Sequence, residues 1–155
     1  RKYRVNPIDF FDYIVPFVAL AQCIGRWGNF FNIEAYGYET TNFFRMRIPM
    51  QDTFIDVHPV FLYESVIDLL IFIFLRKMQP KRKFQGQILY SYLFLYTGAR
   101  FFLEGLRVDS LMFFNLRISK VLSLFVCIYS LIILVKKIIN YRYKKSKEIK
   151  RKEMK

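Results

Sequence analysis

The 155-residue sequence has few of the residues that most catalytic and metal sites use. It contains one histidine and two cysteines, and Cys23 and Cys127 each lie inside an apolar run, without CxxC or metal-ligand spacing. It has no GxSxG elbow, HExxH pair, Walker loop or acidic metal cluster. We therefore expect two small core cysteines, no cofactor and no metal. Any chemistry would rely on substrates that bring their own nucleophile and leaving group.

Acidic residues are also scarce, because 12 Asp and Glu stand against 25 Lys and Arg, for a formal net charge of +13. Such a charge can favour nucleic acid, but here the basic residues are confined to short segments between apolar runs. That arrangement is typical of the cytoplasmic segments of membrane proteins. With 54% hydrophobic residues and a mean hydropathy of +0.19, the composition predicts an integral membrane protein and no nucleic-acid partner.

Four apolar stretches are long enough for helices that cross a lipid bilayer, at about residues 10–31, 58–75, 87–105 and 118–139. They predict an all-α, polytopic membrane protein with a single domain over residues 1–155. Pro16, Gly25 and Gly28 predict a kinked or broken first helix.

The basic segments predict the topology of these spans. Arg1, Lys2 and Arg4 at the start, the loop around Pro80 and the tail at about residues 140–155 are expected on the cytoplasmic side. The tail would also contact anionic lipid headgroups. The loop at about residues 35–57, read as an extracytoplasmic loop or small cap, and the short loop with Arg107, Asp109 and Arg117 are then expected outside.

Residues 25–37, GRWGNFFNIEAYG, place four polar side chains where the first span should end: Arg26, Asn29, Asn32 and Glu34. Charged residues at bilayer depth usually face protein or a wet cavity, since each costs roughly 2.5–3.5 kcal/mol near the bilayer centre. The planar fork of arginine suits phosphate, so the stretch predicts an anion site at the membrane surface. The alternative is a helix-ending GxxG packing motif with an interfacial arginine.

The third span carries a second polar set, Tyr96, Arg100, Glu104 and Arg107, at offsets of four, four and three residues. If helical, these side chains fall within an arc of roughly 80° and form one polar stripe. The alternative is a structural pair of Arg100 with Glu104, with Arg107 reaching toward the membrane surface.

His58 begins a third polar segment, HPVFLYES, which continues with Tyr63 and Glu64. Histidine can act as a general base near neutral pH, but a role as a helix cap explains it equally well. Glu64 and Asp68 are four residues apart and should share an inward face of a helix. Pairing of these acids with arginines of neighbouring spans is a better explanation than catalysis.

Three motifs in this order, GRWGNFFNIEAYG, HPVFLYES and RFFLEGLRVDSLM, closely resemble those of the bacterial prolipoprotein diacylglyceryl transferases. The resemblance implies a multi-pass enzyme of the bacterial cytoplasmic membrane that moves a diacylglyceryl group from phosphatidylglycerol to the lipobox cysteine thiol of a prolipoprotein signal peptide. A thioether forms at the outer face, and glycerol phosphate leaves. The C-terminus would be cytoplasmic.

The same resemblance assigns residues to roles. It implies that Arg26, Asn29, Glu34 and Gly37 bind phosphatidylglycerol, and that Tyr96, Arg100, Glu104 and Arg107 form the catalytic set, with Arg100 linked to catalysis. Asn32, His58, Tyr63 and Glu64 are further candidates. The His-Gly-Gly motif found upstream in the family is absent, so the chain is expected to be the C-terminal part of such an enzyme. The alternative from another class is a non-catalytic module that binds anionic phospholipid or assists membrane assembly.

Overall fold

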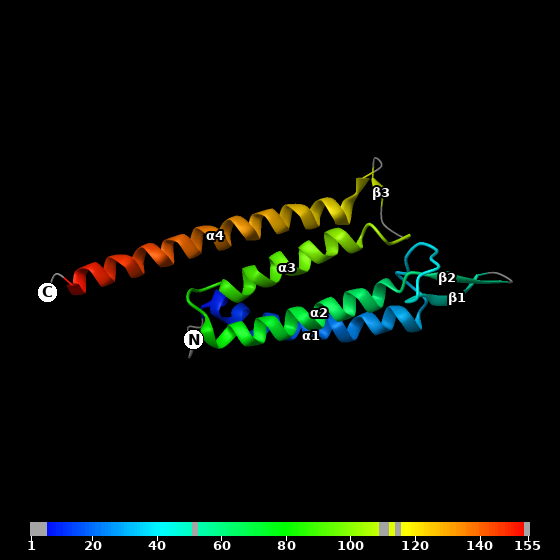
Figure 1. The fold of residues 1–155 in the computed structure, drawn as a ribbon, viewed down its shortest axis with the longest axis horizontal. Coiled ribbons are helices and arrows are strands. Elements are labelled where there is room, and N and C mark those ends of the chain that lie inside the picture. Colours follow the sequence, from blue (N-terminus) through cyan, green and yellow to red (C-terminus); the bar gives the residue numbers. More distant parts are fainter. Residues whose placement is uncertain (1–5, 51–52, 109–111, 114–115, 154–155) are drawn as a thin grey trace.

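The computed structural model describes residues 6–50, 53–108, 112–113 and 116–153. Four helices lie along one another with alternating direction: α1 (Pro7–Phe31), α2 (Val60–Met78), α3 (Gln87–Leu103) and α4 (Ile118–Glu153) (Figure 1). A short 3₁₀ turn, η1 (Gln79–Lys81), follows α2. The predictions made for Arg1, Lys2, Arg4 and Asp109 fall outside the described residues.

Each of the four apolar stretches is helical, as predicted. The last helix is longer than expected, since α4 continues through the basic tail to Glu153. At 1.5 Å per residue, its 36 residues span about 54 Å. In Figure 1 the C-terminal part of α4 extends past the other helices.

The first helix was predicted to be kinked or broken, and it is not broken, because α1 is one α-helix from Pro7 to Phe31. Proline at position 16 has no N–H to donate to the carbonyl of Asp12, four residues earlier. The side-chain amide of Gln79 donates to that carbonyl instead, over 3.2 Å. This replacement bond, made from the end of α2, lets the helix pass through Pro16.

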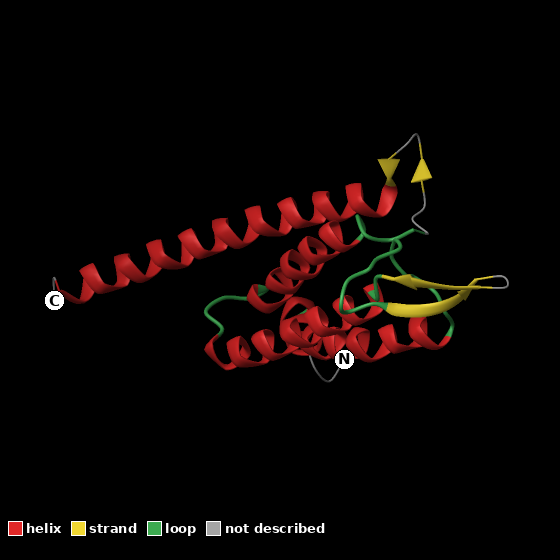
Figure 2. Ribbon diagram, turned by 45° about the vertical axis from the view of Figure 1, so that its right-hand side comes forward, coloured by secondary structure: helices red, strands yellow, loops and turns green. Residues whose placement is uncertain are grey.

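The structure is mostly helical, as predicted, but two short hairpins that were not predicted lie at one end of the helices. Strand β1 (Met46–Met50) pairs antiparallel with β2 (Thr53–Val57), and β3 (Met112–Phe113) pairs with β4 (Leu116–Arg117). Figure 2 shows both hairpins at the end of the molecule away from the C-terminus. The segment predicted as a loop thus contains a β-hairpin.

Alternation of apolar and polar residues explains the β1–β2 hairpin. Ile48 and Val57 are buried beneath the hairpin, whereas Arg47 and Asp56 face each other on its outer side. The guanidinium of Arg47 donates to the Asp56 carboxylate over 2.9 Å. This hydrogen bond holds the pKa of Asp56 below its ordinary value, with a further contribution from Arg45.

The buried core lies where three helices meet. It consists of Val15 and Ala19 of α1, Ile71 and Leu75 of α2, and Ile88 and Tyr92 of α3. Cys23 is buried, as expected, while Cys127 is partly exposed. The core therefore joins α1 to the second half of α2 and the first half of α3.

Much of the outer surface is apolar. Large hydrophobic side chains are exposed along α1, α2 and α4, and only 11% of the most apolar stretch of α4 is buried. Among the described helices, α1 and α4 are long and apolar enough to cross a membrane. A mostly helical chain with this surface has the properties of a helical membrane protein.

Candidate functional site

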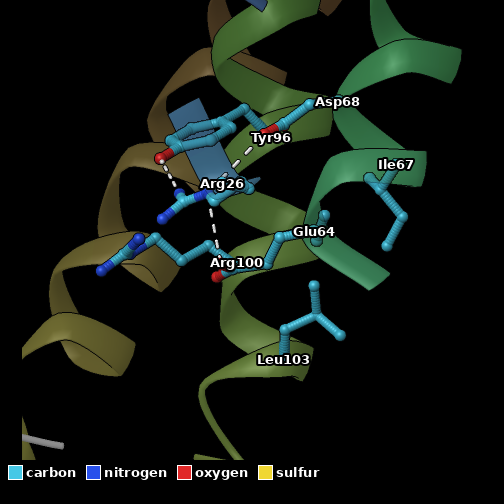
Figure 3. Close-up of a pocket in the computed structure, with 8 residues that line it drawn as sticks. Arg26, Glu64, Ile67, Asp68, Tyr96, Arg100 and Leu103 are labelled. Carbon is cyan, nitrogen blue, oxygen red and sulfur yellow. Dashed lines mark hydrogen bonds and ion pairs between the residues drawn. The ribbon is translucent and has the colours of Figure 1, made fainter. Parts of the chain in front are cut away.

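Charged side chains from three helices meet in one buried pocket. Arg26 of α1, Glu64 and Asp68 of α2, and Tyr96 and Arg100 of α3 line it (Figure 3), and the apolar part of the wall comes from Ile67, Ala99 and Leu103. Arg26 and Arg100 are 74 residues apart in the sequence, so the fold alone brings them together.

Arg26 is held by the other two helices. Its Nε lies 3.2 Å from Oε2 of Glu64 and 3.9 Å from Oδ2 of Asp68, and its Nη2 donates to the Tyr96 hydroxyl over 3.3 Å (Figure 3). Both carboxylates are almost fully buried, with 6% and 4% of their side-chain surface exposed. The expected pairing of Glu64 and Asp68 with an arginine of a neighbouring helix is therefore confirmed.

Arg100 makes looser contacts. Its Nη2 lies 3.8 Å from Oε2 of Glu104, one helical turn further along, and its Nε donates to Oγ of Ser119 on α4 over 3.1 Å. With 27% of its side-chain surface exposed, Arg100 is more open than Arg26 at 17%. It thus keeps more of its donors accessible than Arg26 does.

The pocket is small, and the charges that line it balance. Two arginines and two carboxylates line it, so their formal charges cancel when all four are ionised. The free space between them is about 10 Å³, which is room for about one water molecule. Both carboxylates of the pocket lie against Arg26.

The predicted polar stripe includes one residue too many. Helix α3 ends at Leu103 with Glu104 as its C-cap, so Arg107 lies in the following turn and not on the helix. Glu104 is buried, with 3% exposure, and its backbone carbonyl accepts from the guanidinium of Arg117. The stripe prediction was wrong for Arg107 because Gly105, just after the cap, favours the end of a helix.

Gly37 is at a crossing of three backbone segments. Its N–H donates to the carbonyl of His58 over 2.9 Å, and its backbone pairs with that of Arg107. A Cβ on Gly37 would lie 2.7 Å from Cβ of His58 and 2.9 Å from the carbonyl oxygen of Leu106. Gly37 and Arg107 thus meet each other at the hairpin end, outside the arginine pocket.

The other polar residues of the signature lie at the end of α1. Asn29 is in the last turn of α1, Asn32 is its C-cap, and Glu34 is exposed in the chain that follows. The flanking residues Ile33 and Ala35 have φ values of 56° and 55°, a left-handed conformation that costs roughly 1–2 kcal/mol without glycine. None of these residues is among those that line the arginine pocket.

His58 is paired with a residue of its own motif. Its Nδ1 lies 3.2 Å from the hydroxyl of Tyr63, and its backbone N–H donates to the carbonyl of Tyr38 over 3.0 Å. It lies just before α2, whose first residue is Val60. Of the three candidates in this motif, only Glu64 lines the arginine pocket.

Gly25 and Gly28 do not serve as a packing motif between the described helices. A Cβ on either glycine would have no neighbour within 4 Å among the described residues. The GxxG alternative therefore has no partner helix in the part of the chain that the structure describes. We call this the bare side of α1, since no described residue would contact a Cβ on either glycine.

Two residues of this site are absent from the predicted set. Asp68 was predicted to pair with an arginine but was not named as a site residue. Its i,i+4 spacing from Glu64 already placed both acids on one face of a helix. Ser119, which holds Arg100, carries no local signal, because its contact depends on how α4 packs against α3.

The fold and the pocket define a helical protein of membrane type with a buried arginine–carboxylate cluster between its helices. The family model described as prolipoprotein diacylglyceryl transferase matches residues 1–136. The chain therefore belongs to the prolipoprotein diacylglyceryl transferase family.

Individual relatives agree with this assignment. The phosphatidylglycerol–prolipoprotein diacylglyceryl transferase of Clostridium novyi is 43% identical, over 88% of this chain and 55% of the relative. Proteins of the same name from Finegoldia magna and Streptococcus mutans are 42% and 45% identical, over 88% and 86% of this chain and 54% of each relative. The chain thus spans about half the length of the curated relatives it matches.

Proposed function

We propose that this chain contributes the phosphate-binding half of a phosphatidylglycerol–prolipoprotein diacylglyceryl transferase. The observation that carries the proposal is the convergence of Arg26 and Arg100 on one pocket from separate helices. Two arginines can bind the phosphate of phosphatidylglycerol with charge-assisted hydrogen bonds. The membership of the family supplies the substrate class.

The chemistry follows from where charge develops. The lipobox cysteine thiol gives its proton to a base, its sulfur attacks the glycerol carbon to form a thioether, and the bond from that carbon to the phosphate oxygen breaks. The leaving glycerol phosphate gains negative charge, which cationic donors stabilise more strongly in the transition state than in the ground state. Arg100 is the more exposed of the two arginines and is the proposed catalytic residue.

The remaining candidates receive supporting roles in this proposal. Tyr96 orients Arg26, and Glu104 orients Arg100. Arg107 and Gly37 hold the end of the bundle together, while Asn29, Asn32 and Glu34 approach the lipid from the end of α1. His58 and Tyr63 remain candidates for a proton-accepting pair.

The proposed topology has four spans, with the two hairpins as the outer cap. The active site faces the extracytoplasmic side of the bacterial cytoplasmic membrane, and α4 ends in the cytoplasm. The distribution of basic residues supports this orientation.

The test is thioether formation on a lipobox peptide by a chimera in which this chain replaces the matching segment of the Clostridium novyi relative. Arg100→Ala should reduce turnover by at least about 10²-fold, the usual cost of removing one transition-state donor. Arg142→Ala, on the exposed part of α4, is the matched control and should leave turnover unchanged. If Arg100→Ala turns over like the parent chimera, Arg100 has no catalytic role.

The same assay separates this function from a lipid-binding module. A chimera that binds phosphatidylglycerol but forms no thioether, under conditions in which the parent relative does, would favour the non-catalytic alternative.

A further inference from the structure

The pocket is unsuited to an anion in the form that the structure shows. With two arginines and two carboxylates ionised, the charges that line it sum to zero. A phosphodiester would bring one more negative charge into a site whose acids are almost fully buried. An uncompensated buried charge is costly, so something in the pocket must change before a phosphate enters.

Two nitrogens of the Arg26 guanidinium already face other side chains of the pocket. Nε faces Glu64, and Nη2 donates to Tyr96. The remaining space, about 10 Å³, is far smaller than a phosphate group. A phosphate therefore does not fit beside Arg26 inside this pocket, and we expect it to take the place of a carboxylate on the guanidinium.

Protonation of the carboxylate pair of Glu64 and Asp68 is the change that costs the least free energy. The two acids lie one turn apart on the same face of α2 and share one guanidinium. Like charges that share one counter-ion repel each other, and a proton on either acid removes that repulsion. It also leaves the lining of the pocket with a net charge of +1, which matches one phosphodiester.

We infer that the arginine pocket is a proton-gated anion site. The Glu64–Asp68 pair must bind one proton before the phosphate of an anionic lipid takes the place of a carboxylate on Arg26. This inference rests on the proposed function. It adds that the resting site is blocked by its own acids, and that lipid binding and proton uptake occur together.

Other charged or titratable groups face the pair. They are Arg26 from α1 and Tyr92, Tyr96 and Arg100 from α3. Arginine and tyrosine ordinarily titrate far above neutral pH. Glu104 pairs with Arg100 and is not among the pocket-lining residues, so a Glu104→Gln variant can distinguish its titration from that of the pair.

The test is equilibrium binding of a short-chain phosphatidylglycerol to the purified, catalytically competent chimera with the Clostridium novyi relative in phosphatidylcholine nanodiscs, from about pH 5.5 to pH 8.5. The phosphodiester keeps its single charge over this range. One linked proton predicts that affinity falls about tenfold per pH unit once the pair has lost its proton. Asp68→Asn and Glu64→Gln should bind with the low-pH affinity of the parent at every pH, while Glu104→Gln should keep the slope.

The outcomes separate the two proposals. No binding at any pH, by the parent or by either variant, would remove the phosphate site and with it the proposed function. Binding that does not depend on pH in the parent would overturn the proton gate alone. A pH slope that persists unchanged in both Asp68→Asn and Glu64→Gln would also overturn it, because the proton would then bind elsewhere.

Discussion

Gly37 lies in a short backbone segment that bridges two others at the hairpin end of the molecule. Its neighbour Tyr38 donates from its N–H to the carbonyl of Leu106 over 3.1 Å and accepts at its own carbonyl from the N–H of His58 over 3.0 Å. Residues 36–38 therefore hold the start of α2 and the turn after α3 at a fixed separation. This contact needs a residue without a side chain.

Substitution of Gly37 by alanine should destabilise the protein, since the new Cβ would overlap the side chain of His58 and the carbonyl of Leu106. Overpacking of this kind costs about 1–3 kcal/mol. Gly28→Ala, on the bare side of α1, is the matched control, and it should stabilise the helix by roughly 0.5–1 kcal/mol. Thermal unfolding in detergent, followed by circular dichroism, compares the two.

The opposite order of stability would contradict this role for Gly37. If Gly28→Ala is the more damaging change, a partner must cover the bare side of α1, and Gly28 would then be the close-approach glycine of the signature.

At the scale of elements, α3 depends on a residue of α1 for its start. Gly86, the N-cap of α3, has a φ of 86° and supplies no side chain, while the buried carboxylate of Asp12 accepts from the N–H groups of Gly86 and Leu89 over 2.7 and 2.8 Å. Arg82 pairs with the same carboxylate over 3.1 Å. Asp12 thus acts as an N-cap provided by another helix.

Removal of this cap should loosen the first turn of α3. Asp12→Ala is expected to cost about 0.5–2 kcal/mol, the usual value for a lost N-cap. Hydrogen–deuterium exchange should show faster exchange at the amides of Gly86 and Leu89. Asp9→Ala is the control, because Asp9 also pairs with Arg82 but accepts only from the side chain of Gln85. Equal exchange in the two variants would show that the cap has no effect.

The elements that could be predicted from the sequence were those with a strong local signal. All four helices could be predicted from apolar stretches of membrane-spanning length. The spacing of Glu64 and Asp68 predicted that the two acids share one face of a helix. The β1–β2 hairpin was missed although Met46, Ile48, Ile55 and Val57 alternate with polar residues. Five-residue strands inside a polar segment give too short a pattern to outweigh a loop.

The rest depends on contacts between distant segments. Continuity of α1 through Pro16 requires Gln79, and the anchoring of Arg100 requires Ser119. The sequence around Gln79 and around Ser119 contains no motif that predicts these contacts. Helix ends were the other weak point, since a stripe drawn through Arg107 assumes that α3 continues past Leu103.

At the scale of the whole molecule, the two ends differ in character (Figure 1). One end carries both hairpins and the turn with Arg107. The other carries the basic connection between α2 and α3, and α4 is attached there by Lys137, whose ammonium donates to the carbonyl of Gln85 over 2.7 Å. By the positive-inside rule, the end with the basic connection is expected on the cytoplasmic side and the hairpin end on the outer side.

The orientation can be tested with cysteines introduced at the two ends, in a background in which Cys23 and Cys127 are replaced. Phe43, which is 91% exposed beside the β1–β2 hairpin, and the exposed Lys81 after α2 are suitable positions. A membrane-impermeant maleimide should label Phe43→Cys in intact cells, and should label Lys81→Cys only after the membrane is opened. Both positions lie outside the four α-helices, so neither change should disturb the spans. If Lys81→Cys is labelled first, the arginine pocket lies nearer the cytoplasmic face, and a phosphate site open to the outer leaflet would be untenable.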